Sequence, residues 1–414
     1  MNSQTTTATP LKKGKSVLKS LPRNVWVVTA TSFLTDISSE MIVNLLPFFL
    51  ANVLGAKTAA IGLIEGLAET TASLLKIFSG WLSDRLNARK WPSVLGYAIS
   101  TLSKPFFLIA NTWNAVMTIR ISDRIGKGVR TAPRDALVAD SISEKHRGLA
   151  FGLHRAGDTA GAMIGTLIAA AILWNSKQGA LLTRATFQKV VWWSILPAVL
   201  AVLILAIGSK EVPIKEKGTP KLSLAGFDSR FRWYLATIVL FTLGNSSDAF
   251  LLLRAQERGL GLVEILLMDA SFNLIYAIIS GPAGALSDKV GRRRIIVIGW
   301  LVYALIYLGF AVANATWQIW ALYALYGIYY GMAEGTGKAL VADLVPSEKR
   351  GTAYGVYNAA VGLAAFPASF IAGILWQGIG SWQGFGPAAP FFFGAGLALV
   401  AAVMLRQILQ GKPA

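Results

Sequence analysis

The sequence predicts an all-α integral membrane protein with twelve transmembrane helices. Hydrophobic residues make up 54% of its 414 residues and charged residues only 14%, and the mean hydropathy is +0.54. Soluble domains carry about 25% charged residues, so this composition is typical of a chain embedded in lipid. Apolar windows of about 20 residues, long enough to cross roughly 30 Å of hydrocarbon, recur along most of the chain.

The apolar windows form two groups of six. The expected spans are 24–50, 58–82, 92–112, 113–136, 147–174 and 189–208, then 231–255, 262–286, 294–314, 316–343, 351–377 and 387–406. A stretch rich in Lys, Pro and Gly separates the groups and predicts a linker. The expected segments are an N-terminal tail at 1–23, a six-helix bundle at 24–208, a linker at 209–230, a second six-helix bundle at 231–406 and a C-terminal tail at 407–414.

An internal repeat relates the two groups. The sequence Ala-Leu-Val-Ala-Asp at 136–140 returns at 339–343, and Arg147-Gly148 returns as Arg350-Gly351, both 203 residues later. The segment Ser38-Ser39-Glu40 resembles 246–248 at an offset of 208, and this drift requires only small insertions. The repeat predicts two pseudo-symmetric bundles in which Glu40 and Asp248 occupy matched places.

The net charge of +18 is concentrated in loops on one side. Lys and Arg cluster before the first span, after the second and eighth spans, and in the linker. Such loops are cytoplasmic by the positive-inside rule, which predicts that both tails are cytoplasmic. We expect a multi-pass protein of a bacterial inner membrane, a monomer surrounded by lipid, and no nucleic-acid partner.

Charged residues also occur inside the spans. In 114–165, Arg120, Asp123, Arg124 and Lys127 have helical spacing, and a charged group facing lipid is costly, so we expect them to face a wet cavity or partner helices. One interpretation is a structural salt-bridge network between the fourth and fifth spans, formed by Arg120, Asp123, His154, Arg155 and Asp158. Glycines at 157, 161 and 165 predict close helix packing.

A loop motif occurs twice. Gly80-Trp81-Leu82-Ser83-Asp84-Arg85 follows the second span, and Gly284-Ala285-Leu286-Ser287-Asp288-Lys289 follows the eighth. The chain thereby resembles the major facilitator superfamily of transporters, although Asn87 and Ala88 stand where the first copy usually has Gly. The resemblance implies two bundles that rock about a central site, and a conformational latch on the cytoplasmic side built from Gly80, Asp84, Arg85, Gly284, Asp288, Lys289 and Arg292.

The resemblance also implies that the first, fourth, seventh and tenth helices line the site. The first half then offers cations and the second half aromatic rings, which suits an amphipathic or aromatic solute, including an anionic one. The expected substrate-binding residues are Asn44, Arg120, Arg124, Lys127, Arg155, Asn245, Tyr323, Tyr326 and Tyr330. Tyr323 to Tyr330 are also consistent with simple packing.

No catalytic, nucleotide-binding or metal-binding motif was found, and the chain has no cysteine and two histidines, so we expect neither an enzyme nor a cofactor. An ion gradient must then supply the energy. Carboxylates within a membrane are plausible proton carriers, and the candidates are Glu40 and Asp248, followed by Asp36 and Asp158. The predicted function is proton-coupled transport of a small organic solute, with efflux preferred. The alternatives are an importer of an organic anion such as a siderophore or metabolite, and a non-transporting sensor or scaffold.

Overall fold

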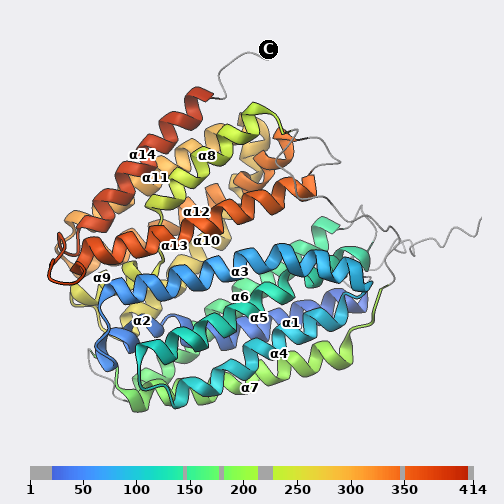
Figure 1. Cartoon of the computed structure of the whole chain (residues 1–414), viewed down its shortest axis with the longest axis horizontal. Coiled ribbons are helices and arrows are strands. Elements are labelled where there is room, and N and C mark those ends of the chain that lie inside the picture. Colours follow the sequence, from blue (N-terminus) through green and yellow to red (C-terminus); the bar gives the residue numbers. More distant parts are fainter. Residues whose placement is uncertain (1–20, 143–146, 177–180, 213–226, 346–349, 409–414) are drawn as a thin grey trace, which may run out of the picture.

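The computed structural model describes residues 21–142, 147–176, 181–212, 227–345 and 350–408, without the side chains of residues 84, 147–149, 342, 350–352 and 408. The regions 1–20, 213–226 and 409–414, which hold most of the predicted tails and linker, lie outside the described residues. The described chain is built from long helices that run roughly side by side (Figure 1).

The first half contains six spans. They are α1 (Arg23–Val43) continued by α2 (Leu46–Phe48) and the π-helical turn η2 (Phe49–Val53), α3 (Thr58–Leu86), α4 (Lys90–Ser103) continued by the 3-10 turn η3 (Lys104–Leu108), α5 (Trp113–Asp140), α6 (Arg147–Asn175) and α7 (Arg184–Gly208). The observed bounds agree with the predicted windows to within a few residues at most ends.

The second half repeats this order. Its spans are α8 (Ser229–Gly244) with α9 (Ala249–Glu257), α10 (Leu262–Val290), α11 (Arg292–Val312), α12 (Thr316–Leu344), α13 (Arg350–Gln377) and α14 (Ala389–Ile408). Eight spans in the described chain are long and apolar enough to cross a membrane by length and composition alone. The remaining spans, α3, α4, α5 and α12, include the helices with the most internal charge.

Glycine allows close packing within the first half, where α1 lies against α6 and α7. A Cβ atom added at Gly157, Gly161 or Gly165 of α6 would contact Thr29, Phe33 and Ile37 of α1, respectively. The prediction of close helix packing at these glycines is therefore confirmed.

The first and seventh spans are interrupted near their middles. The first is interrupted between α1 and α2, just before Pro47, which lacks a backbone donor, and the seventh at residues 245–248 between α8 and α9. Glu40 lies within α1, one turn before its break, whereas Asp248 lies inside the break of the seventh span. The prediction that these two carboxylates occupy matched places is therefore wrong, because the helix breaks fall at different offsets from them. Interrupted helices at membrane depth are tolerated where protein or a cavity satisfies the freed backbone groups.

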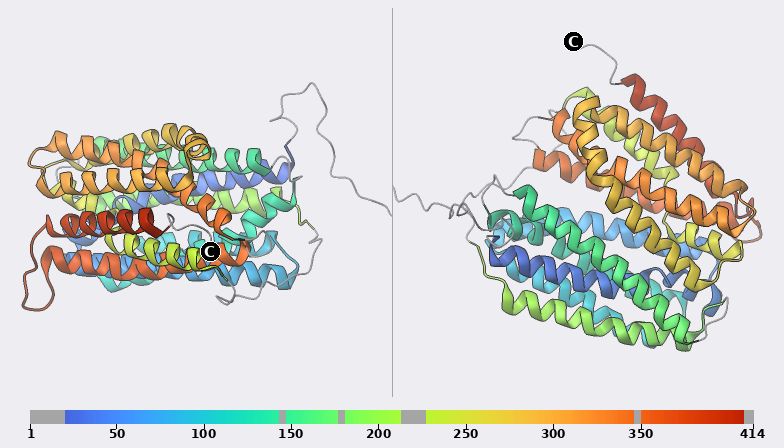
Figure 2. Two further views of the ribbon diagram at one scale, coloured as in Figure 1. Left: turned by 90° about the horizontal axis from the view of Figure 1, so that it is seen from above. Right: turned by 180° about the vertical axis from the view of Figure 1, so that it is seen from behind.

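The two halves meet along α3 with α13 and along α6 with α10 (Figures 1 and 2). Thr58 Oγ1 donates to the Gly373 carbonyl at 2.9 Å, and Thr70 Oγ1 donates to the Gly362 carbonyl at 2.5 Å. Beyond these contacts α3 and α13 diverge toward the α3 C-terminus at Leu86 (Figure 1). The halves therefore touch along the part of α3 nearest Thr58 and separate toward the opposite end.

Candidate substrate cavity

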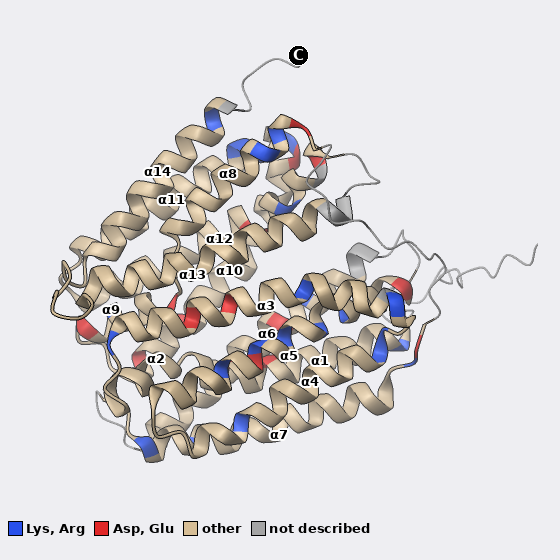
Figure 3. Cartoon of the chain, viewed as in Figure 1, with Lys and Arg blue, Asp and Glu red and all other residues tan. Residues whose placement is uncertain are grey.

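A cavity of about 480 Å³ lies between the two halves. Its charged lining comes from five spans of both halves: Glu40 of α1, Glu65 and Glu69 of α3, Arg124 and Lys127 of α5, Asp248 before α9, and Asp269 of α10. Figure 3 shows acidic residues in the middle of α3 and basic residues in the middle of α5. This charge is buried between helices, as expected for charged groups at membrane depth.

Eight of the predicted site residues line this cavity. They are Glu40, Asn44, Arg124, Lys127, Asn245, Asp248, Tyr323 and Tyr330. Five others lie outside the lining: Asp36, Arg120, Arg155, Asp158 and Tyr326. Most of the side chains predicted from the first, fourth, seventh and tenth spans therefore lie on the wall of this cavity.

Arg120 belongs to an ion-pair cluster beside the cavity. Its Nη2 lies 2.9 Å from Glu65 Oε2, its Nη1 lies 3.7 Å from Asp123 Oδ2, and its side chain is 5% exposed. Asp123 also lies 3.6 Å from Arg124 Nε. Arg120 is therefore held by two carboxylates and does not reach the cavity, whereas its neighbour Arg124 does.

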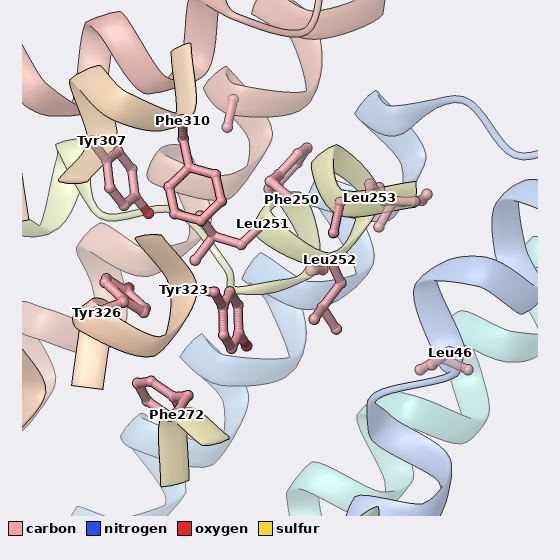
Figure 4. Packing of buried hydrophobic residues seen from close by; sticks show 14 of the residues in the cluster. Leu46, Phe250, Leu251, Leu252, Leu253, Phe272, Tyr307, Phe310, Tyr323 and Tyr326 are labelled. Atoms are coloured by element: carbon pink, nitrogen blue, oxygen red, sulfur yellow. The ribbon is translucent and has the colours of Figure 1, made fainter. Parts of the chain in front are cut away.

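The seventh and tenth spans form an aromatic and carboxylate wall. Tyr326 donates a hydrogen bond to Asp248 Oδ1 at 3.1 Å, and Tyr330 donates to Asp248 Oδ2 at 3.4 Å. Phe272 packs edge-on against Tyr323 and Tyr330, with ring centroids 5.5 and 5.3 Å away. Figure 4 shows Phe272, Tyr323 and Tyr326 close together on facing helices. Tyr326 is buried behind the lining and contacts Asp248 through this hydrogen bond.

Asp269 lies where the two halves meet at the cavity. Its Oδ2 accepts hydrogen bonds from Asn44 Nδ2 at 3.0 Å, Thr166 Oγ1 at 3.2 Å and Asn273 Nδ2 at 3.2 Å. Its Oδ1 accepts from Tyr323 at 3.1 Å. Asn44 and Thr166 belong to the first half and Tyr323 to the second, so this carboxylate joins the halves.

The predicted network between the fourth and fifth spans does not form. His154 Nε2 and Ser32 Oγ are hydrogen-bonded at 2.9 Å, and His154 Nδ1 lies 3.5 Å from Asp158. Arg155 instead reaches across to the second half, where its Nη2 lies 3.0 Å from Glu334 and 2.6 Å from the Tyr276 hydroxyl. The five proposed members therefore divide into three separate groups, because their side chains point in different directions around the helices.

The sequence model of the Major Facilitator Superfamily matches residues 28–268 and 222–413, which together include almost the whole chain. The chain belongs to the Major Facilitator Superfamily. It is similar to the uncharacterized MFS-type transporter MJ1317 of Methanocaldococcus jannaschii, with 34% identity over 405 residues that cover 95% of this chain and 97% of the relative. The efflux pump PmrA of Streptococcus pneumoniae is 24% identical and covers 78% of this chain and 82% of its own length.

Solved structures share the facilitator fold. A bacterial homologue of the human lysosomal transporter Spinster, solved in an inward-facing and occupied conformation, matches with a TM-score of 0.77 and 16% identity. The match covers 97% of this chain and all of that chain. Membership of the superfamily, together with the helices that could cross a membrane, shows a multi-pass secondary transporter and not an enzyme.

The second copy of the facilitator loop motif lies in an ion-pair cluster. Asp288 Oδ1 lies 3.0 Å from Arg292 Nη2, and Arg292 Nε lies 2.6 Å from Asp343 Oδ2. These three residues all belong to the second half. In the first copy, Arg85 stacks over Trp81 with its guanidinium 5.3 Å from the ring centroid, and the side chain of Asp84 lies outside the described residues. Gly80 faces Ala132, Gly284 faces open space, and Lys289 is exposed.

Sequence reasoning missed the cavity carboxylates of the second and eighth spans. Glu65, Glu69 and Asp269 lie in α3 and α10, which the facilitator rule for the central site does not include. A signal was present in the sequence, because each of these acidic residues interrupts an apolar window. Such a residue marks a functional position by default in a membrane helix.

Proposed function

We propose that this facilitator is a proton-coupled exporter of a small organic solute that carries a basic nitrogen. The observation that carries the proposal is the charge of the cavity, which is lined by five carboxylates and only two cations. One of the five, Glu65, is already paired with Arg120. The remaining acidic excess attracts a cationic group and disfavours a solute whose only charge is negative.

The aromatic wall supports the same substrate class. Phe272, Tyr323 and Tyr330 lie beside Asp248 and Asp269 in the second half. A protonated amine gains from both a carboxylate and a ring face in a desolvated pocket. Arg124 and Lys127 in the first half suit an acidic group at the opposite end of the solute. An aromatic zwitterion or amine therefore fits better than the organic anion that the sequence analysis gave as an alternative.

Proton coupling is assigned first to Glu40. Within the described part of the chain this carboxylate has no hydrogen-bond or ion-pair partner, although it lines the cavity. Asp248 differs, because two tyrosine hydroxyls support its ionised form. A carboxylate without such support in a membrane cavity favours the neutral state, and can bind a proton and release it when the cavity opens to the other side.

Export is favoured by the names of two relatives, an efflux pump and the multidrug resistance protein 2 of Bacillus subtilis. We assign the charged ends near Leu86 and Arg292 to the cytoplasmic face of a bacterial inner membrane, following the positive-inside rule. The cavity is built from one chain, so a monomer is the proposed transporting unit.

The test is transport in proteoliposomes under an imposed pH gradient. Three probes share one ring system and differ in charge: tryptamine, tryptophan and indole-3-acetate. The proposal expects proton-driven movement of tryptamine or tryptophan, and much less of indole-3-acetate. Selective movement of indole-3-acetate would support the organic-anion importer instead. Binding without movement of any of the three would support a sensor.

A further inference from the structure

We infer that Asp269 links proton binding to the relative movement of the two halves. This inference rests on the proposed proton coupling and concerns a residue of the eighth span. The observation behind it is that Asp269 accepts hydrogen bonds from both halves at once: from Asn44 and Thr166 of the first half, and from Asn273 and Tyr323 of the second.

Its hydrogen-bond partners all act as donors toward the ionised carboxylate. An ionised carboxylate only accepts hydrogen bonds, whereas a protonated one must also donate through one oxygen. Asp269 Oδ2 receives both contacts from the first half, at 3.0 and 3.2 Å. A proton on that oxygen therefore removes acceptor capacity at the atom that joins the halves.

The surrounding side chains give no substitute link. Asp269 is 6% exposed, Asn44 8% and Thr166 fully buried, so little of this contact is open to solvent, although Asp269 and Asn44 border the cavity. Asn44 Nδ2 also donates to Thr166 Oγ1 at 3.1 Å, which holds the two donors of the first half as one unit. Losing the bonds to Asp269 keeps the Asn44–Thr166 bond within the first half, but the Thr166 hydroxyl loses the acceptor of its own proton. The contact between the halves at this point is therefore weakened.

Other titratable or charged groups share the cavity with Asp269 and contribute to its field. They are Glu40 of α1, Glu65 and Glu69 of α3, Arg124 and Lys127 of α5, Asp248 before α9, and Tyr323 and Tyr330 of α12. Asp248 provides the closest comparison. It is also a cavity carboxylate held by hydrogen bonds, but its two donors, Tyr326 and Tyr330, come from its own half. Protonation of Asp248 therefore breaks no bond between the halves.

The experiment measures movement without transport. The native chain contains no cysteine, so spin labels can be attached at Leu86→Cys and Val290→Cys without background labelling. These exposed residues end α3 and α10 in different halves. The distribution of distances between the two spin labels is measured by double electron–electron resonance in lipid nanodiscs, at alkaline and at acidic pH. Acidification should shift the native distribution toward shorter distances, as the halves rock and this end closes.

Three variants test whether the shift depends on Asp269. Asp269→Asn should lose the pH response and give the acidic distribution at both pH values, whereas Asp248→Asn should keep the native response. Thr166→Val, which keeps its shape but removes one donor of the first half, should move the alkaline distribution toward the acidic one. This third variant keeps the inference testable if Asp269→Asn fails to fold.

The inference is overturned if Asp269→Asn or Thr166→Val shows the same distance distributions as the native chain. It is also overturned if Asp248→Asn loses the pH-dependent shift to the same extent, or if the native distances do not change with pH. These outcomes are separate from the proposed function. Suppose that the native protein moves no solute under a pH gradient, while its spin-label distances still shift with pH in a way that Asp269→Asn abolishes. That result contradicts the proposed transport but supports this inference. Proton-driven transport without a role for Asp269 gives the reverse result.

Discussion

Arg89 Nε lies 3.2 Å from Asp140 Oδ2, and this ion pair ties the start of α4 to the end of α5. The same pair recurs 203 residues later, where Arg292 Nε lies 2.6 Å from Asp343 Oδ2 at the start of α11 and the end of α12. The spacing equals that of the sequence repeat. Two copies of one structural unit have therefore kept this contact although most of their other residues have diverged.

The two copies of this ion pair should contribute unequally to stability. Arg89 and Asp140 have side chains 10% and 31% exposed, against 27% and 51% for Arg292 and Asp343. Removing a partner from the more buried pair leaves a desolvated charge, so Asp140→Asn should cost about 1–3 kcal/mol and Asp343→Asn under about 1 kcal/mol. Thermal unfolding in detergent micelles measures both. Equal shifts in the midpoint would contradict this ranking.

The fold could be predicted from the sequence because its signals are local. Apolar windows mark the spans, and the repeat at 136–140 and 339–343 assigns α5 and α12 to equivalent places. The glycines at 157, 161 and 165 likewise predicted close packing of α6, which their contacts with α1 confirm. Spacing along one chain segment was sufficient for each of these inferences.

The site could be predicted only in part, because partners on different helices determine what a charged residue does. Arg120 and Arg124 lie one helical turn apart in the same charged segment of the sequence. Only Arg124 lines the cavity, because Arg120 is paired with Glu65 of another span. Arg155 pairs with Glu334 across the halves, 179 residues away. No periodicity within one helix contains this information.

Arg120 and Lys127 should respond differently to substitution. Lys127 lines the cavity and has no ion pair in the described chain, so Lys127→Met should weaken binding of a probe with a carboxylate about 10- to 100-fold, the value of a desolvated charge-assisted hydrogen bond. Binding of the matched amine should change little. Isothermal titration with tryptophan and tryptamine measures this difference.

Arg120→Met is the companion variant. It leaves Glu65 without its partner, so it should lower the unfolding midpoint, and Glu65→Gln in the same chain should restore part of the loss. If Arg120→Met folds normally and weakens only probe binding, Arg120 belongs to the binding site after all.

Glycines at the contact between the halves should control the conformational balance. A Cβ at Gly62 of α3 would collide with the Ser369 carbonyl of α13. Gly62→Ala should therefore disfavour the arrangement in which these helices touch, by about 1–3 kcal/mol, or roughly 5- to 150-fold in the ratio of states. Spin-label distances between Lys57→Cys and Gln377→Cys, both exposed, report this end of the molecule.

Two further glycine variants are controls for that experiment. Gly281→Ala meets nothing within 4 Å, so it should leave the distances unchanged and should not lower the stability of α10. Gly161→Ala crowds α1 within the first half, so it should lower the unfolding midpoint without changing the ratio of states. An unchanged distance distribution in Gly62→Ala would show that the α3–α13 contact adapts to a methyl group.

Proton coupling should depend on Glu40 more than on the other candidate carboxylates. Glu40 faces the cavity without a partner in the described chain, Asp248 is supported by two tyrosines, and Asp36 and Asp158 lie outside the cavity lining. Glu40→Gln keeps the side-chain shape but holds it neutral, so it should abolish accumulation driven by a pH gradient. Asp36→Asn and Asp158→Asn should retain that accumulation, and Asp248→Asn should remain driven by the pH gradient while binding an amine more weakly.

Exchange of labelled for unlabelled solute in vesicles without a gradient is the control, because it needs rocking of the halves but no net proton transfer. Glu40→Gln should exchange at close to the native rate, which separates loss of coupling from loss of the protein or of substrate binding. Sodium and proton gradients are imposed separately, so that dependence on the ion is measured in the same vesicles. If Glu40→Gln still accumulates solute under a pH gradient, the proton binds elsewhere, and loss in Asp248→Asn alone would assign it to the seventh span. If all four variants remain driven by pH, none of these four carboxylates carries the proton alone.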